Sequence, residues 1–322
     1  CDARGRVAID GASAYRRAVS TRRLALTLGD PRGIGPELVA AAIAPAQWSA
    51  LVDGDDIEPF VIGAEGTVAP VHESVGRWTP DLEAAPASTL AGTLAGRAIE
   101  RAVALTLEGR THGIVTAPIH KRALADAGYD HPGHTEMLAA LTGADTTMML
   151  ASDRLRVVLV TTHLALRDVP DAVTVDAIVE TAARTRDGLR TYFGIPSPRL
   201  ALCALNPHAG DGGRFGDEDD RILTPAALQA GLIGPLPADT VFVRALRGEF
   251  DAVLAPVHDV GMTAIKVASF GHGVNITLGL PFPRTSPDHG TAIDIAGRGL
   301  ADPSSFFEAV RLAARLVRAA AH

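Results

Sequence analysis

Short apolar runs separated by longer amphipathic stretches recur along most of this 322-residue chain. The runs at 155–163, 199–205 and 252–257 are rich in small and β-branched residues, and their length predicts strands buried on both faces of a parallel sheet. Other stretches repeat apolar residues at helical spacing, which predicts helices at 89–109, 173–192 and 306–320. This alternation predicts an α/β fold with a largely parallel sheet.

The first predicted strand, residues 24–28, runs directly into the glycine-rich segment GDPRGIGPE. Gly33 and Gly35 favour a tight turn, Pro36 suits the first position of a helix, and Glu37 suits the positive end of the helix dipole. A strand-to-helix turn of this kind can hold an anion on its backbone N–H groups. The GxGxxG spacing of dinucleotide-binding turns is absent, so a purely structural turn is the alternative.

Three apolar runs end near a histidine, namely His163, His208 and His258. In an open α/β sheet, ligands bind beyond the carboxyl ends of parallel strands, where side chains from several strands meet. Because imidazole is the commonest metal ligand near neutral pH, these histidines predict a divalent-metal site. The alternative is that each is an ordinary core or capping residue, because their wide separation matches no local metal-binding motif.

Further polar residues accompany these strand ends. Asp259 and Lys266 follow the third histidine and would bring a carboxylate and an ammonium to the same edge. His134 and Thr135 precede a predicted helix, where the threonine could act as the N-terminal cap. Segment 274–299 combines glycine and proline with a dense set of polar side chains, which predicts a binding loop rather than a connector.

Two other polar segments are expected to have ordinary roles. His120, which precedes Lys121 at a predicted helix start, is expected to be solvated. The acidic run Glu218, Asp219 and Asp220 is expected to form a solvated face, although one of its carboxylates could approach the metal ion.

Composition narrows the class of partners. The formal net charge is −7 without a basic cluster, which argues against nucleic acid and against a polybasic membrane surface. The two cysteines, Cys1 and Cys203, are too few for a disulfide framework and fit a reducing, cytoplasmic location. No apolar stretch approaches the roughly 20 residues that span a bilayer. Residues 1–22 lack the apolar segment of a secretory signal and are expected to form a disordered N-terminal extension.

Several longer motifs occur in collinear order from about Arg23 to the C-terminus: GDPRGIGPE, PGHTE, THLALRDVPDAVT, LNPHAGDGG, HDVG…K and VNITLGLPFPRTSPDHGTAIDIAG. Together they resemble the 4-hydroxythreonine-4-phosphate dehydrogenase family of vitamin B6 (pyridoxal phosphate) biosynthesis. The resemblance implies a two-domain α/β/α fold, like that of isocitrate and isopropylmalate dehydrogenases, with a cleft between the domains. It implies an NAD-binding domain at 23–132 plus 282–322, and a metal, substrate and dimerisation domain at 133–281.

The resemblance also assigns roles to individual residues. A divalent ion (zinc, magnesium, cobalt or manganese) would be held by His163, His208 and His258, the last from the partner subunit of a homodimer whose active site lies near the interface. The substrate-binding residues that it implies are His134, Thr135, Lys266, Asn275 and Arg284. The loop that would bind NAD, or NADP, contains Asp288, His289, Gly290, Thr291 and Asp294. The candidates by residue type for the group that removes the hydroxyl proton are Lys266, Asp259 and His134.

The reaction implied is the NAD-dependent oxidation of 4-phosphooxy-L-threonine to a 3-keto acid, which decarboxylates to 3-amino-1-hydroxyacetone phosphate. A bound cation would lower the pKa of the substrate hydroxyl. Arg284, Asn275 and Lys266 suit the phosphate and carboxylate, because guanidinium and ammonium groups pair well with such anions.

The sequence departs from the family pattern at one motif. The family usually has Tyr-His-Asp-Gln-Gly around the third histidine, whereas here Val257 precedes it and Val260 replaces the glutamine. This leaves open a relative's substrate, D-threonate or D-erythronate 4-phosphate. A cyclic dihydrodiol, oxidised by another relative, is disfavoured because Asn275 and Arg284 are retained. Alternatives in other classes are a metal-dependent hydrolase, a phosphate acyltransferase of related fold and a binding protein without activity.

Overall fold

A mixed sheet of eleven strands runs through the described part of the chain, in the order β3-β2-β1-β4-β11-β10-β5-β6-β9-β7-β8. The computed structural model describes residues 21–54, 56–79, 86–270 and 272–320. The predicted extension at 1–22 therefore lies outside the described residues except at its end, where β1 already begins at Arg22. The strands are β1 (Arg22–Thr27), β2 (Ile57–Glu65), β3 (Glu73–Arg77), β4 (Gly113–Thr116), β5 (Thr147–Ala151), β6 (Arg156–Leu159), β7 (Leu200–Cys203), β8 (Ile233–Leu236), β9 (Ala252–Ala255), β10 (Val274–Leu278) and β11 (Arg284–Pro287).

The sheet is largely parallel, as the sequence predicts. Antiparallel pairing is confined to its middle, where β10 pairs with β11 and with β5, and β5 pairs with β6. The other pairs are parallel. Strands β4, β7 and β9 are short apolar or small-residue strands buried at every position, which fits helices on both faces of the sheet.

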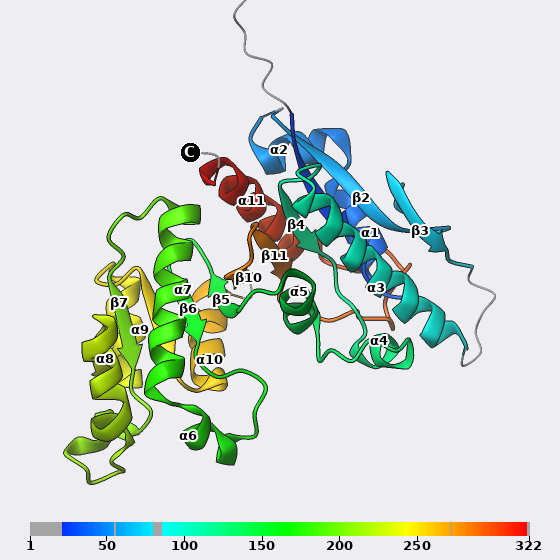
Figure 1. Ribbon diagram of the computed structural model, residues 1–322. Coiled ribbons are helices and arrows are strands. Elements are labelled where there is room, and N and C mark those ends of the chain that lie inside the picture. The colour runs from blue at the N-terminus through cyan, green and yellow to red at the C-terminus, as the bar shows by residue number, and fades with distance from the viewer. Residues whose placement is uncertain (1–20, 55, 80–85, 271, 321–322) are drawn as a thin grey trace, which may run out of the picture.

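The strands form two groups that meet where β11 pairs with β10. One lobe, largely blue and cyan, contains β1 to β4 and β11, and the other, green to yellow, contains β5 to β9 (Figure 1). The chain leaves the first lobe after β4 and returns to it with β11. The domain boundaries at 132/133 and 281/282, and the function assigned to each domain, stay predictions.

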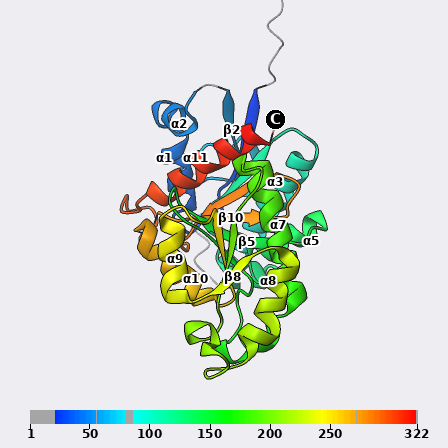
Figure 2. The same ribbon diagram turned by 90° about the vertical axis from the view of Figure 1, so that its left-hand side faces the viewer.

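Helices cover both faces of the sheet, so that neighbouring strand residues enter different cores. In the first lobe Ala25 packs in the cluster that contains Ile99 of α3, whereas Leu24 and Leu26 pack in the cluster that contains Val310 of α11. In the second lobe α9 and α10 lie on one side of the strands, and α7 and α8 lie on the other (Figure 2). The helices are α1 (Gly35–Ala42), α2 (Pro45–Val52), α3 (Pro86–Leu107), α4 (Lys121–Asp126), α5 (His134–Thr142), α6 (Val169–Ala172), α7 (Val175–Phe193), α8 (Thr224–Ala230), α9 (Ala238–Leu246), α10 (His258–Ser269) and α11 (Ser304–Ala319).

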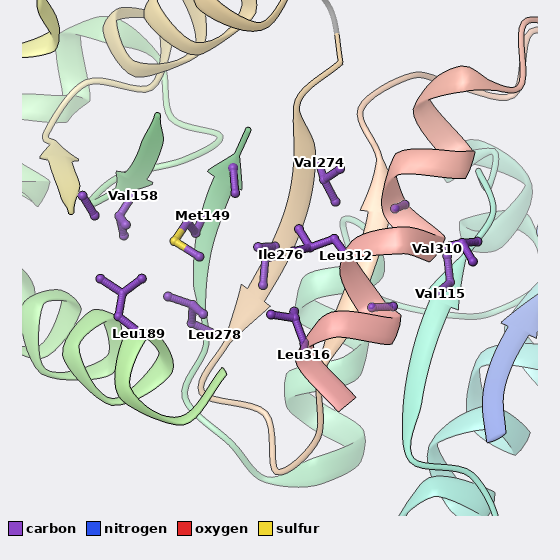
Figure 3. Close-up of a cluster of buried hydrophobic side chains, with 14 of the residues drawn as sticks. Val115, Met149, Val158, Leu189, Val274, Ile276, Leu278, Val310, Leu312 and Leu316 are labelled. Atoms are coloured by element: carbon purple, nitrogen blue, oxygen red, sulfur yellow. The ribbon is translucent and has the colours of Figure 1, made fainter. Parts of the chain in front are cut away.

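Helix α11 joins the two lobes. It packs on β4 and β11 of the first lobe and on β10 and α7 beyond them. Its residues Leu312 and Leu316 lie beside Val274 and Ile276 of β10 in a continuous apolar cluster (Figure 3). The helical spacing of apolar residues in the sequence therefore predicted a helix, α11, whose apolar face packs against both lobes.

The predicted helices at 89–109, 173–192 and 306–320 correspond to α3, α7 and α11, with ends that differ by a few residues. The ends of α7 follow from capping. Thr174 accepts a hydrogen bond from the backbone N–H of Ala177, and Gly194 ends the helix in the left-handed conformation. Within the described residues, the helices are all too short or too polar to cross a membrane.

Candidate active site

A cleft of about 370 Å³ opens between the carboxyl end of β4, the start of α5 and the strands β10 and β11. It collects residues that are far apart in the sequence. The sequence-predicted residues that line it are His134, Thr135, His163, Asn275, Arg284, Asp288, His289 and Gly290. The cleft therefore unites most of the predicted substrate residues with the start of the predicted cofactor loop.

Arg284 is the buried cation at the base of this cleft. Its side chain is only 1% exposed, because β11 runs between β4 and β10. The guanidinium donates to Thr277 Oγ1 at 3.0 Å and to Thr116 Oγ1 at 2.6 Å, while its Nε is buried without a partner. Burial lowers its pKa from 12.5 to about 9, so it stays charged at neutral pH. Among the described residues no carboxylate lies within 4 Å of it, so the cation has no ion-pair partner, and the more distant Glu136 offsets its charge only in part.

Asn275 and His134 also present unsatisfied polar atoms. Asn275 Oδ1 on β10 and His134 Nε2 at the start of α5 are both buried without a hydrogen-bond partner. Burial, and then the charges of Arg284 and Lys121, hold the pKa of His134 well below its usual 6.5, so the imidazole is neutral at pH 7. Buried polar groups are ordinarily paired, so these atoms indicate a ligand-binding surface.

Thr135 lines the cleft but is not the helix cap that the sequence suggested. Helix α5 begins at His134, its N-cap is Gly133, and no side chain caps it. Thr135 therefore lies in the first turn, where its hydroxyl is available to the cleft rather than to the backbone.

Three further polar side chains of the cleft were not predicted from the sequence. Lys121 begins α4 just beyond the carboxyl end of β4, Glu136 lies in the first turn of α5, and Ser286 lies opposite Asn275 in the β10–β11 pair. Lys121 obeys the same rule that drew attention to the histidines, because it follows a buried strand of the parallel part of the sheet. Glu136 and Ser286 carry no comparable signal in the sequence.

The three strand-end histidines follow neighbouring parallel strands. Strands β6, β9 and β7 are adjacent in that order, so His163, His258 and His208 leave the same edge of the sheet. The rings of His163 and His258 lie 5.8 Å apart, whereas His208 packs against Phe215 with 6.4 Å between ring centroids. Within the residues described for this one chain, no group of three His, Cys, Asp or Glu side chains is arranged to hold a metal ion.

The two paired histidines each have a carboxylate beside Nδ1. His258 Nδ1 lies 2.8 Å from Asp259 Oδ1, and His163 Nδ1 lies 3.9 Å from Glu136 Oε1. Burial lowers the pKa of His163, which favours the neutral imidazole that binds metals. Metal-binding histidines commonly donate Nδ1–H to a carboxylate, which leaves Nε2 for the ion. The chemistry of these donors therefore fits a divalent cation, and Asp259 is placed to orient His258.

His208 lies in a strained turn that an acidic residue holds in place. His208 and Ala209 have positive φ angles of 54° and 56°, which non-glycine residues rarely adopt. Asp219 accepts hydrogen bonds from the backbone N–H groups of Leu205 and Asn206, both at 2.9 Å, just before this turn. Asp219 is only 1% exposed, so the prediction that it belongs to a solvated face is wrong.

Lys266 does not line the cleft directly. Its Nζ forms an ion pair of 3.0 Å with Asp288 Oδ2, and Asp288 is part of the cleft wall. This pair links α10 of the second lobe to the loop that follows β11 of the first lobe. Two residues predicted for different roles, substrate and cofactor binding, therefore contact each other.

The predicted cofactor loop rests on the glycine-rich turn. Ile34 N–H donates to Thr291 O at 2.9 Å, and a Cβ on Gly33 would lie 2.7 Å from that oxygen. In the turn itself, the Asp30 carboxylate is bound by the side chain and backbone N–H of Arg32. The turn is thus packed against neighbouring backbone, which fits a structural turn rather than an anion-binding one. In the loop, His289 Nε2 is buried without a partner, whereas Asp294 is exposed.

Residues 40–313 match the sequence model of the family described as pyridoxal phosphate biosynthetic protein PdxA. A 4-hydroxythreonine-4-phosphate dehydrogenase from Geobacter metallireducens is 43% identical over 92% of this chain and 96% of that protein. A putative D-threonate 4-phosphate dehydrogenase from Bradyrhizobium diazoefficiens is 42% identical over 94% of this chain and 99% of that protein. The crystal structure of a 4-hydroxythreonine-4-phosphate dehydrogenase from Klebsiella pneumoniae has a TM-score of 0.79 and 37% identity, with 92% of this chain and 99% of that one covered.

Proposed function

Because the chain belongs to the family of the pyridoxal phosphate biosynthetic protein PdxA, we propose that it oxidises 4-phosphooxy-L-threonine with NAD. The product is a 3-keto acid that decarboxylates to 3-amino-1-hydroxyacetone phosphate. The family and the α/β fold are those that the sequence motifs indicated, so both predictions are confirmed.

The observation that carries this proposal is the buried guanidinium of Arg284. A desolvated cation without an ion-pair partner is costly, and a dianionic phosphate would neutralise it with charge-assisted hydrogen bonds. Lys121, which lines the same cleft, adds a second positive charge. A chain whose net charge is −7 needs such a local concentration of cations to hold an anionic substrate.

The remaining cleft residues suit the amino-acid end of the substrate. Asn275 Oδ1 is a free acceptor, and His134 Nε2 is unpaired and accepts or donates according to its tautomer; both suit the substrate ammonium or hydroxyl. His134 is also the candidate proton acceptor best placed in the cleft, since Lys266 is paired with Asp288 and Asp259 is exposed beside His258. Thr135 supplies a hydroxyl from the first turn of α5.

The cofactor and the metal ion are assigned to the residues that the family resemblance implied. Asp288, His289, Gly290, Thr291 and Asp294 would hold NAD or NADP, and His163, His208 and His258 would hold one divalent ion. When bound, the nicotinamide accepts the hydride and the cation acts as a Lewis acid that lowers the pKa of the substrate hydroxyl. In the proposed homodimer, His258 of the partner subunit completes the set with His163 and His208. This division of the ligands rests on the family resemblance, because within one chain it is His258 whose ring lies beside His163.

D-Threonate or D-erythronate 4-phosphate is the second candidate substrate. One relative is named a putative D-threonate 4-phosphate dehydrogenase, at an identity close to that of the others. The substitution at Val260 gives it little further support, because Val260 packs against the apolar cluster that contains Ile265 and Leu159 and does not line the cleft. The candidates differ at the substrate amine, so the assay must compare them directly.

The deciding experiment is NADH formation at 340 nm with NAD, a divalent cation and each of the three phosphorylated substrates. Turnover mainly of the amino acid, abolished by a chelator, supports the proposal. Faster turnover of a sugar acid moves the enzyme to the second candidate. Loss of substrate in a parallel reaction without NAD, followed by chromatography, would indicate a hydrolase.

A separate measurement tests the metal site. His208→Ala should remove most of the bound divalent ion, counted per subunit by elemental analysis of the purified protein. Retention of full stoichiometry would contradict the ligand assignment. A dimer mass by light scattering is expected for both proteins, which shows that the loss of metal does not come from dissociation.

A further inference from the structure

A second and larger cavity, of about 640 Å³, lies on the other side of the central strand β10. Val274 lines this cavity, whereas its neighbour Asn275 lines the candidate active site. Successive residues of a strand point to opposite faces of the sheet, so the two cavities are separated by the sheet itself. The walls of the larger cavity come from the turn between β5 and β6, the ends of α7 and α10, and α11 from Glu308 to Ala319. We call it the Arg156 cavity.

Arg156 supplies a largely buried cation to this cavity. Its Nη1 donates to the backbone oxygen of Asp251 at 3.1 Å, and its guanidinium lies over the Phe193 ring at 4.7 Å from the centroid. Its Nε is buried without a partner. No carboxylate within the described residues approaches it to 4 Å, because the Asp251 carboxylate is bound by Arg199.

One edge of the Arg156 guanidinium, formed by Nε and Nη2, has no hydrogen-bond partner within the described residues. In a guanidinium, Nε–H and the adjacent Nη2–H form a planar fork that matches a carboxylate or phosphate. Nη1 binds Asp251 O and Nε is buried, so an anion in the cavity would reach this fork from the Nη2 side. The stacked Phe193 ring holds the guanidinium plane in place, which reduces the entropy lost when an anion binds.

The mouth of the cavity adds positive charge. Arg154 is exposed there, and Arg315 pairs with Asp153 at 3.6 Å. The other acidic residue of the wall, Glu308, is bound by Arg311. The arginines of the lining therefore exceed the carboxylates that could compete for them, although the chain as a whole is acidic.

The remaining walls are apolar. Val274, Leu312 and Leu316 form one side and are drawn close together in Figure 3. Tyr192 and Phe193, at the end of α7, add aromatic rings, and the Tyr192 hydroxyl is already used in a bond to Leu280 O. A cationic end and an apolar body are thus combined in one cavity.

We propose that the Arg156 cavity is a second ligand site, which binds a small organic anion with one carboxylate or phosphate monoester on an apolar or aromatic body. The anionic group meets the Arg156 fork, and the body lies against α11 and the end of α7. This site is independent of the substrate cleft and does not depend on the proposed reaction. Because α11 belongs to the first lobe and the β5–β6 turn to the second, the ligand joins the two lobes.

Calorimetric titration with phenyl phosphate tests this site. The titration is made in an Arg284→Met background, which removes the cation of the substrate cleft as a competing site. We expect saturable binding of one phenyl phosphate at concentrations up to about 1 mM. Inorganic phosphate should bind more weakly, because it lacks the apolar body. Absence of phenyl phosphate binding in this background would overturn the proposal.

Three added substitutions locate the bound anion. Arg156→Met should weaken phenyl phosphate binding by at least about tenfold, as expected for the loss of a charge-assisted fork. Ala319→Trp fills the cavity without touching the arginine and should weaken binding similarly, which keeps the test valid if the first variant folds poorly. Arg154→Met, at the mouth, is the matched control and should have a small effect. Unchanged affinity in both Arg156→Met and Ala319→Trp would exclude this cavity as the binding site.

Discussion

Replacement of Arg284 by methionine should separate activity from stability. The guanidinium is 1% exposed and has hydroxyl partners but no ion-pair partner in the described structure. Its pKa falls from 12.5 to about 9, and at 1.36 kcal/mol per pKa unit this corresponds to a cost of about 5 kcal/mol for the buried charge. Methionine removes that cost but leaves two threonine hydroxyls without their donor, at about 1–3 kcal/mol each. The net change in unfolding free energy should therefore be small.

The effect of Arg284→Met on catalysis should be large. Two charge-assisted hydrogen bonds to a substrate phosphate contribute about 1.5–3 kcal/mol each. Their loss lowers kcat/KM by about two to four orders of magnitude. The assays are NADH formation with 4-phosphooxy-L-threonine and urea unfolding followed by circular dichroism.

Thr277→Val is the matched control for this prediction. Valine has a similar shape to threonine and keeps the guanidinium, but it removes the oxygen that accepts from Nη1. This variant should lose about 1–3 kcal/mol of stability and keep most of the activity. Arg284→Met should thus lower the activity and Thr277→Val the stability. If Arg284→Met instead loses several kcal/mol of stability together with its activity, the arginine is a structural residue and the reasoning is refuted.

Three further predictions concern neighbouring parts of the site. Asp219→Asn should lower the free energy of unfolding by about 1–3 kcal/mol and weaken metal binding, because an amide cannot accept from both backbone N–H groups. Asp220→Asn, at an exposed position, should change neither stability nor metal binding, and equal effects of the two variants in metal titration would contradict this role of Asp219. Gly33→Ala should raise KM for NAD more than KM for the substrate, because the new methyl group would contact Thr291 O. His134 binds a proton less readily in the folded than in the unfolded chain, so stability should fall as the pH drops below about 6.5. His134→Asn should make this fall smaller in urea unfolding measured across pH, and an unchanged pH profile would show that His134 does not cause it.

Sequence patterns were enough to predict the fold class and to place the three histidines at one edge of the sheet. Apolar runs of strand length fixed β6, β7 and β9, and each is followed by a histidine. Side chains beyond the carboxyl ends of adjacent parallel strands must lie at one edge, so this inference needed only local pattern and a general rule. The longer motifs then identified the family.

Which residues of that edge lie together depends on the packed fold. It paired His163 with His258 and left His208 beside Phe215, a distinction that depends on the strand order β6-β9-β7 and on a strained turn. It buried Asp219, which in the sequence is one acidic residue among several, because backbone N–H groups thirteen and fourteen residues away lie within hydrogen-bonding distance.

The environment of a charged side chain is the property that sequence patterns predict least well. A family motif marks Arg284 as a binding residue, but no local pattern shows that the guanidinium of Arg284, or the Nε of Arg156, is withdrawn from solvent. Their burial arises from the position of β11 between β4 and β10, and of β6 between β5 and β9. Desolvation is a property of everything that surrounds a group, contributed by segments distant in the chain. The periodic pattern of a strand or helix therefore predicts the element, whereas the energy of a charge within it is set by the packed fold.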